Sequence, residues 1–179
     1  MKKNLLLYLL LLYIPTFGQI STTSDIDGSV TITPKGLIGK NNTNSISNIG
    51  LGNNSLLSNT TGYNNTAIGA SALKMNSSGN MNTANGAFAL TSNTIGSQNT
   101  ASGHQSLWLN TTGGGNTAFG TSTLVANTSG SGNTAIGVNS LINGNSNRNT
   151  AVGYWTMIFN STGENNSAMG YFSLLGNQS

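Results

Sequence analysis

The 179-residue chain contains no cysteine, only two prolines and very few charged residues, which make up 5% of it. Without cysteine there are no disulfide bonds, on which small exported domains often depend, and no thiolate ligands for a metal. The charged fraction lies far below the roughly 25% of ordinary globular domains. The sequence has instead 24 glycines and a large share of Asn, Ser and Thr. This composition is typical of a repetitive fibrous protein.

The net charge of +3 does not indicate a nucleic-acid partner. Lys2 and Lys3 lie in a segment that we expect to be removed. The other charges nearly cancel and are spread along the chain: Lys35, Lys40, Lys74 and Arg148 against Asp25, Asp27 and Glu164. Because phosphate binding needs clustered Lys and Arg, we expect no nucleic-acid binding.

Residues 1–18 have the pattern of a secretory signal peptide. Two lysines precede an apolar run over residues 5–14, Pro15 ends the run, and cleavage is expected after Gly18. The alternative, a retained anchor, is disfavoured because the run is about half of the roughly 20 residues that span a bilayer. We therefore expect the mature chain to be secreted or displayed at the cell surface, with no membrane span.

The rest of the chain is dominated by a 17-residue repeat over residues 48–179. The pentapeptide Asn-Thr-Ala-x-Gly recurs every 17 residues, with one step of 16. We number each unit from its first Asn and call the units coils 1 to 8; the last one is incomplete. Position 1 is occupied by Asn48, Asn65, Asn82, Asn99, Asn116, Asn133, Asn149 and Asn166. The missing residue of coil 6 falls between Asn143 and Arg148.

The pattern within the unit predicts an all-β fold, a parallel β-solenoid (β-roll) of eight 17-residue coils. Units rich in Asn, Gly, Thr and Ser disfavour helices, because these side chains compete for backbone hydrogen bonds. A Gly at position 5 predicts one corner, and Asn-Thr/Ser-Thr/Ser-Gly at positions 12–15 predicts a type I turn. Between these turns we predict two short strands per coil, at positions 2–4 and 8–9. The position 1 Asn residues should stack in a ladder about 4.8 Å apart, with amides hydrogen-bonded along it.

Two apolar stripes follow from the register. Position 9 predicts the core, which comprises Leu56, Leu73, Leu90, Leu107, Leu124, Leu141, Met157 and Leu174. Position 4 is more variable, which favours a contact between subunits: Leu51, Ile68, Asn85, Ser102, Phe119, Ile136, Val152 and Met169. The alternative is that position 4 lines the lumen of a monomeric stack.

Repeats such as Asn65 to Leu73 and Asn133 to Leu141 resemble the head repeats of trimeric autotransporter adhesins. They are also similar to repeats of exported bacterial and phage tail-fibre proteins. The resemblance covers residues 48–179 and implies a left-handed parallel β-roll, a homotrimer and adhesion. This chain departs from the adhesin pattern by its extra Asn-Thr-Thr-Gly turn. No stalk, anchor or chaperone domain follows the repeats, so we expect a truncated product or a fragment.

Residues 19–47 lie outside the repeat. Residues 29–33 alternate like a strand and residues 34–36 carry a turn signal, which favours a cap on the first coil. The alternative is a linker, since residues 40–48 are nearly all polar.

The sequence offers little for catalysis, and we expect a non-enzyme without cofactors. His104 is the only imidazole, and Asp25, Asp27 and Glu164 are the only acids, in separate segments or coils. A metal site is equally unsupported, because calcium-binding solenoids use ladders of Asp, whereas these turns carry neutral Asn.

The candidate ligand-binding residues are aromatic and gather in the last two coils: Tyr154, Trp155, Tyr171 and Phe172, with Phe159 nearby. An outward strip of such rings could cover sugar rings or an apolar protein surface. The alternative is that the rings pack on one another or beneath a further domain. The expected function is a surface fibre that binds host, surface or glycan ligands. Ice binding, or a purely structural spacer, is the alternative.

Overall fold

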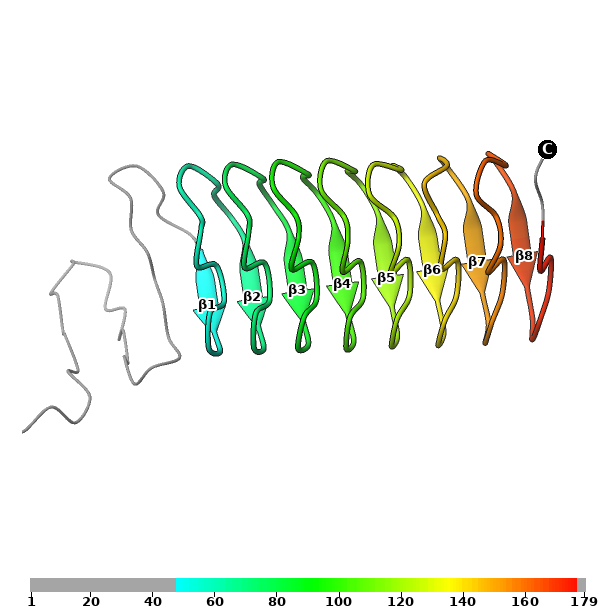
Figure 1. The fold of residues 1–179 in the computed structure, drawn as a ribbon, viewed down its shortest axis with the longest axis horizontal. Coiled ribbons are helices and arrows are strands. Elements are labelled where there is room, and N and C mark those ends of the chain that lie inside the picture. The colour runs from blue at the N-terminus through cyan, green and yellow to red at the C-terminus, as the bar shows by residue number, and fades with distance from the viewer. Residues whose placement is uncertain (1–47, 177–179) are drawn as a thin grey trace, which may run out of the picture.

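The computed structural model describes residues 48–176, which form a parallel β-solenoid (Figure 1). Each coil contributes one three-residue strand to a single eight-stranded sheet whose order follows the chain. The strands are β1 (Ile49–Leu51), β2 (Thr66–Ile68), β3 (Thr83–Asn85), β4 (Thr100–Ser102), β5 (Thr117–Phe119), β6 (Thr134–Ile136), β7 (Thr150–Val152) and β8 (Ser167–Met169). The predicted fold class is confirmed at this level. The expected signal peptide, the residue 19–47 cap and the last three residues lie outside the described part.

Every strand pairs with the next in the register that the repeat predicts. Thr66 lies opposite Thr83, and Ala67 lies opposite Ala84. The strand's middle residue points into the coil and its flanking residues point outward, as the alternation of a strand requires. The 16-residue coil keeps this register, because Thr134 still pairs with Thr150.

The prediction of a second strand at positions 8–9 was wrong. This return segment is a series of turns in which positions 7 and 9 adopt positive φ, for example 57° at Gln105 and 50° at Leu107. Left-handed backbone costs an L-residue roughly 1–2 kcal/mol, which burial of a leucine, worth about 1.5–3 kcal/mol, offsets. Coil-to-coil hydrogen bonds nevertheless continue, since Leu107 N–H donates to Thr123 O at 2.9 Å. Backbone hydrogen bonds between successive coils therefore continue in the return segment, where there is no strand.

The corner between the strand and the return segment requires glycine at position 5. Gly103 has a φ of 132°, and a Cβ placed there would lie 2.5 Å from the carbonyl oxygen of Gly120 in the next coil. Both the backbone angle and the close approach exclude a side chain. The position 5 corner therefore sets how closely successive coils can stack.

The core is narrow and consists of two facing rows. Position 3 supplies alanines such as Ala101, and position 9 supplies the leucines, which are fully covered from Leu73 to Met157. Leu174 departs from the prediction and is 40% exposed, because no further coil covers it among the described residues. Position 4 faces solvent, with Phe119 60% exposed. The alternative that this row lines the lumen is therefore wrong.

The position 1 asparagines form a buried hydrogen-bonded ladder. Asn99 Nδ2 donates to Asn82 Oδ1 in the preceding coil at 3.2 Å and to Gly113 O in its own coil at 2.9 Å. Its own Oδ1 accepts the backbone N–H and Nδ2 of Asn116 at 3.0 and 3.1 Å. In the middle of the solenoid, an amide such as that of Asn99 therefore satisfies its polar atoms while joining three successive coils.

A second ladder runs through position 12, where the sequence predicted only a turn. Asn110 Nδ2 donates to Asn93 Oδ1 at 2.8 Å and to Gly113 O at 3.0 Å. The carbonyl oxygen of Gly113 therefore accepts from both ladders at once. This shared acceptor ties the end of each coil to its beginning.

The missing residue of coil 6 falls in the predicted region and interrupts only the second ladder. Gly144 occupies position 12, and a Cβ there would lie 2.5 Å from Leu124 Cδ2, so a larger residue would have to displace this core leucine. The buried Asn127 Oδ1 consequently accepts no hydrogen bond within the described residues. Ser146 replaces the position 15 Gly, and its carbonyl accepts from Asn133 Nδ2 at 2.8 Å. The sheet remains continuous. The first ladder continues through the backbone N–H of Asn149, which donates to Asn133 Oδ1 at 2.9 Å, while Asn149 Nδ2 donates to Ser146 Oγ at 2.9 Å.

We predict that Leu107→Asp destabilises the solenoid strongly, whereas Thr112→Asp does not. Leu107 is fully buried, and Thr112 is exposed in the position 12–15 turn of the same coil. A charge without a partner in the apolar row should cost about 3–5 kcal/mol. Thermal melts followed by circular dichroism would test this. Equal melting temperatures for the two variants would remove position 9 from the core.

We predict that Asn99→Asp is also destabilising, by about 2–4 kcal/mol. The substitution replaces the Nδ2 donor by a carboxylate oxygen that faces Asn82 Oδ1 and Gly113 O. Asn53→Asp is the matched control, because Asn53 is an exposed asparagine at position 6. Urea unfolding of both variants would measure the difference. A wild-type midpoint for Asn99→Asp would contradict a structural role of the ladder.

Candidate binding surface

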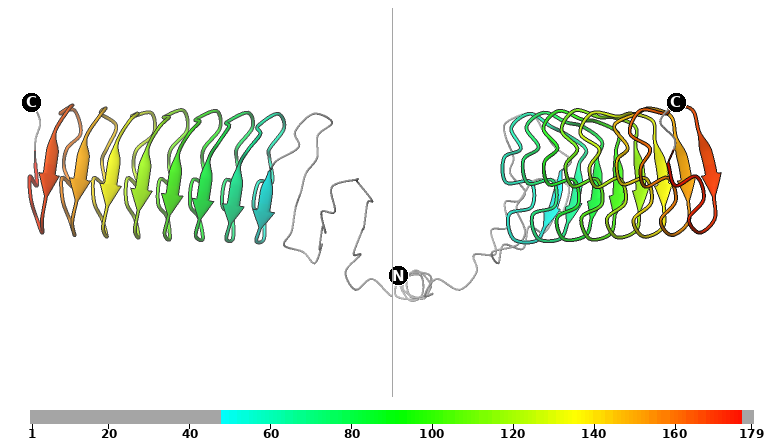
Figure 2. Two further views of the ribbon diagram at one scale, coloured as in Figure 1. Left: turned by 180° about the vertical axis from the view of Figure 1, so that it is seen from behind. Right: turned by 45° about the vertical axis from the view of Figure 1, so that its right-hand side comes forward.

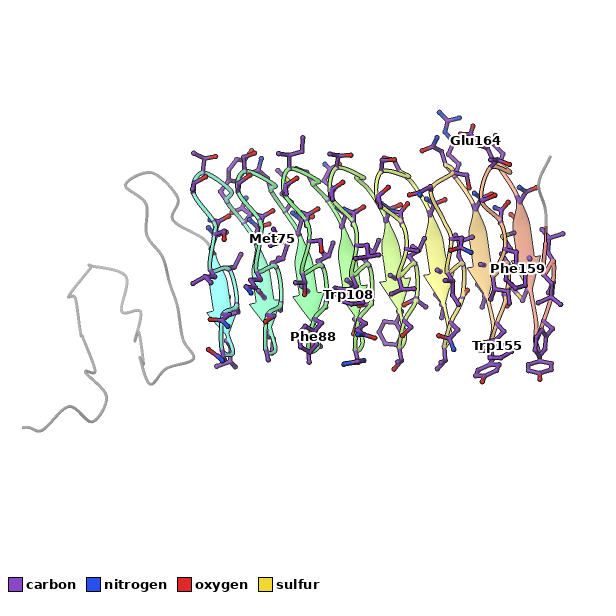
Figure 3. The ribbon with its side chains drawn as sticks, in the orientation of Figure 1. Met75, Phe88, Trp108, Trp155, Phe159 and Glu164 are labelled. Carbon is purple, nitrogen blue, oxygen red and sulfur yellow. The ribbon has the colours of Figure 1, made fainter. Side chains whose placement is uncertain are left out.

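The described residues carry few groups able to do acid–base chemistry, and those groups are dispersed. His104 is exposed on coil 4, where its ring meets the edge of Phe88 at 5.9 Å between centroids. Glu164 lies in the loops at the other end of the coil (Figure 3), where its Oε1 accepts from Asn147 Nδ2 at 2.6 Å. Asp25 and Asp27 lie outside the described part. Within residues 48–176 no group of three His, Cys, Asp or Glu residues could hold a metal.

The predicted aromatic residues come together at the corner of coils 7 and 8. Gly153 and Gly170, with φ of 140° and 115°, turn the chain at position 5. Trp155 and Phe172 follow at position 7 with φ of 56° and 53°. The two turns have the same shape, so equivalent rings of adjacent coils lie side by side.

Four rings form one continuous patch, the corner patch: Tyr154, Trp155, Tyr171 and Phe172. Tyr154 and Tyr171 stack at 5.7 Å with an 18° angle between planes, and Trp155 meets the edge of Phe172 at 5.0 Å. Tyr154 also stacks on Trp155 at 5.4 Å. Aromatic pairs at these separations attract each other. The corner patch is therefore held in shape by its own ring contacts.

The tyrosines form the outer layer of the corner patch. Tyr154 is 45% and Tyr171 70% exposed, whereas Trp155 and Phe172 are half-buried. The indole nitrogen of Trp155 is covered, and its N–H has no acceptor among the described residues. Phe159 is exposed but does not belong to the patch, because it projects at mid-height of coil 7 while Trp155 lies at the lower corner (Figure 3). A partner at the corner would meet mainly the two phenol rings.

Sequence reasoning missed a second outward apolar row, which we call the return row. It consists of position 10 (Leu57, Lys74, Thr91, Trp108, Val125, Ile142, Ile158 and Leu175) and position 11 (Ser58, Met75, Ser92, Leu109, Ala126, Asn143, Phe159 and Gly176). Exposed or half-buried apolar side chains occupy it in most coils. Its residue types change from coil to coil, so a search for repeated identities passes over it. Counting apolar character alone at each position would have found it.

Within residues 48–176 there is no helix with the length and apolar character needed to cross a bilayer. Comparison of the chain with known protein families, curated proteins and solved structures finds no match in any of the three. The resemblance to adhesin head repeats consequently rests on the repeat motif itself.

Proposed function

We propose that this protein is a secreted or cell-surface fibre protein that self-associates and adheres to host, surface or glycan ligands, without enzymatic activity or a cofactor. The observation that carries the proposal is the placement of large apolar side chains outside the coil. Phe119, Phe159 and Tyr171 are each more than half exposed, while the interior holds alanine, leucine and asparagine. Extended apolar surface on an exported protein favours contact with other molecules.

Self-association is supported by how little apolar volume one stack encloses. Each full coil buries chiefly one leucine or methionine and one or two small residues. We infer a parallel homotrimer of left-handed solenoids, as the resemblance implies. The position 4 row, which we call the strand row, serves as a subunit contact because it lies outside and is mainly apolar.

Adhesion is supported by the corner patch. The stacked faces of Tyr154 and Tyr171 offer a flat apolar surface with two phenol hydroxyls, which suits the alternating apolar faces and hydroxyls of a sugar chain. The solvent-exposed corner also suits an apolar patch on a protein. The half-buried ring of Trp155 stacks on Tyr154 and supports its position in the patch.

Ice binding is the second candidate, favoured by one regular threonine per coil at position 2 of the sheet: Thr66, Thr83, Thr100, Thr117, Thr134 and Thr150. A flat array of these threonines would require small residues at the other outward positions of the sheet. Instead Phe119 projects from position 4 of the same sheet face. Adhesion is therefore the better proposal, and a spacer without its own ligand is the outcome if the corner patch binds nothing.

We predict that the processed, exported chain has the mass of three chains in light scattering. Ile136→Glu, which places a charge in the outward strand row, should shift the mass to one chain with an unchanged circular dichroism spectrum. Thr112→Glu, at an exposed position of the turn outside the strand row, is the control and should remain trimeric. A wild-type protein that is monomeric at high concentration would contradict the proposed assembly.

We predict that the double variant Trp155→Ala, Tyr171→Ala binds cells or a glycan array about tenfold more weakly or worse, because two ring contacts of about 1 kcal/mol each are lost. Phe88→Ala removes an exposed position 7 ring outside the corner patch and should leave binding unchanged. Both variants would be checked for wild-type melting temperatures. Undiminished binding by a folded double variant would make the corner patch structural and place adhesion elsewhere.

A further inference from the structure

The strand row and the return row lie on different walls of the solenoid. Positions 3 and 9 are both buried in the core, and their neighbours at positions 4 and 10 lie on the outside of two different segments, the strand and the return segment. The turned view separates the wall of strands from the wall of return segments (Figure 2). Both walls carry apolar residues, and one copy cannot bring them together. Each wall therefore needs a partner from outside.

We propose that the strand row of one copy packs against the return row of the next copy, coil against equal coil, in parallel. This inference rests on the proposed self-association and specifies which surfaces meet. Two parallel copies share the coil spacing, which is the roughly 4.8 Å of neighbouring strands. A second copy of this chain is therefore a partner whose rows coincide at every coil. An unrelated surface lacks this period.

The size of the side chains in the two rows is complementary in coils 4 and 5. In coil 4 the strand row has the small Ser102 and the return row has the large Trp108 and Leu109. In coil 5 the order is reversed, with Phe119 in the strand row and the smaller Val125 and Ala126 in the return row. A small residue thus meets a large one in both coils, as close packing requires.

The polarity of the two rows also agrees in equal coils. Coil 3 pairs Asn85 with Thr91 and Ser92, and it is the coil in which both rows are fully polar. Coil 6 pairs Ile136 with Ile142. Lys74 is the only charged residue of the two rows in the described part, and its aliphatic stem can cover Ile68 while its ammonium group stays in water. No pair of like charges opposes the contact.

A slip by one coil in either direction destroys this agreement. Shifted one way, Phe119 would meet Trp108 and Leu109, which places large side chains against each other. Shifted the other way, the polar Asn85 would meet Trp108, and the small Ser102 would meet Val125 and Ala126 where the equal register has the larger Trp108 and Leu109. Polar groups buried against apolar ones and voids both cost free energy. The sizes and polarities of the residues in the two rows therefore favour the register in which equal coils meet.

This contact joins two different surfaces, so it is heterologous. Each copy uses one wall toward one neighbour and the other wall toward the next, and a closed ring leaves no row uncovered. A like-with-like contact of strand rows would instead place Phe119 beside Phe119 and leave every return row exposed. The return row thereby acquires a role in the assembly that the strand row alone does not explain.

Cysteine pairs can test the contact cleanly, because the natural chain contains none. The variants are Ile136→Cys and Ile142→Cys in coil 6, and Ser102→Cys in coil 4. Two single variants of the full exported chain, one carrying a size tag, are folded together and oxidised. A disulfide needs Cα atoms within about 7 Å, so it reports a direct contact. Mobility on a denaturing gel identifies the linked tagged–untagged pair.

We expect Ile136→Cys mixed with Ile142→Cys to give several-fold more linked pairs than Ser102→Cys mixed with Ile142→Cys, which lies two coils out of register. Equal yields from both mixtures would overturn the register. Efficient linking of Ile136→Cys to itself would overturn the heterologous contact and show that strand rows meet. An absence of linkage in assemblies that keep the mass of three chains would overturn the contact while the proposed assembly stands. If every variant and the wild-type protein were monomeric, both the contact and the proposed assembly would be overturned.

Discussion

The solenoid depends on the side-chain amides of its buried asparagines. An amide carries a donor and an acceptor on one short side chain, so a position 1 asparagine can accept from the coil after it and donate to the coil before it. Asn99 does both and also donates to Gly113 in its own coil. A hydroxyl is too short and a carboxylate lacks the donor. The interior is therefore neutral, and the hydrogen bonds between amides of successive coils fix one register.

This ladder explains why the residue types at the buried positions are nearly constant from coil to coil, whereas those at the outward positions vary. The close approach at the position 5 corner and the narrow row of Ala101 and its equivalents leave no space for larger groups. Coil 6 tolerates its deletion only because Gly144 removes a side chain and Ser146 supplies the carbonyl that Asn133 needs. The buried position 8 varies only among Ala, Ser and Thr, whereas the positions that face solvent vary widely in size and polarity. The proposed binding surfaces consist of these outward positions.

The outer surface separates two tasks in the proposed assembly. The strand row and the return row lie on the two walls, where neighbouring copies would meet. The corner patch lies at the turn between the walls and is absent from the proposed contact. Its tyrosines would therefore stay accessible in an assembled fibre. A fibre of this kind would show the corner patch once per chain, and several weak contacts to one surface would reinforce one another.

The sequence by itself determined the parallel solenoid, the register of every coil and the position of the core rows. Identical spacing forces equivalent residues such as Asn82 and Asn99 to stack, whatever the local backbone does. It also located the deletion, because only the turn region lacks repeated apolar residues.

Only the tertiary structure decided the shape of the return segment. The left-handed backbone at Leu107 is unfavourable for an isolated leucine and exists because the core and the next coil compensate it. The same holds for the second ladder, since Asn110 looks like an ordinary turn residue until Asn93 lies beneath it. The return row and the exposure of Leu174 likewise follow from which coils lie on either side. Local sequence preferences determine a turn, but contacts between coils determine which way each side chain points.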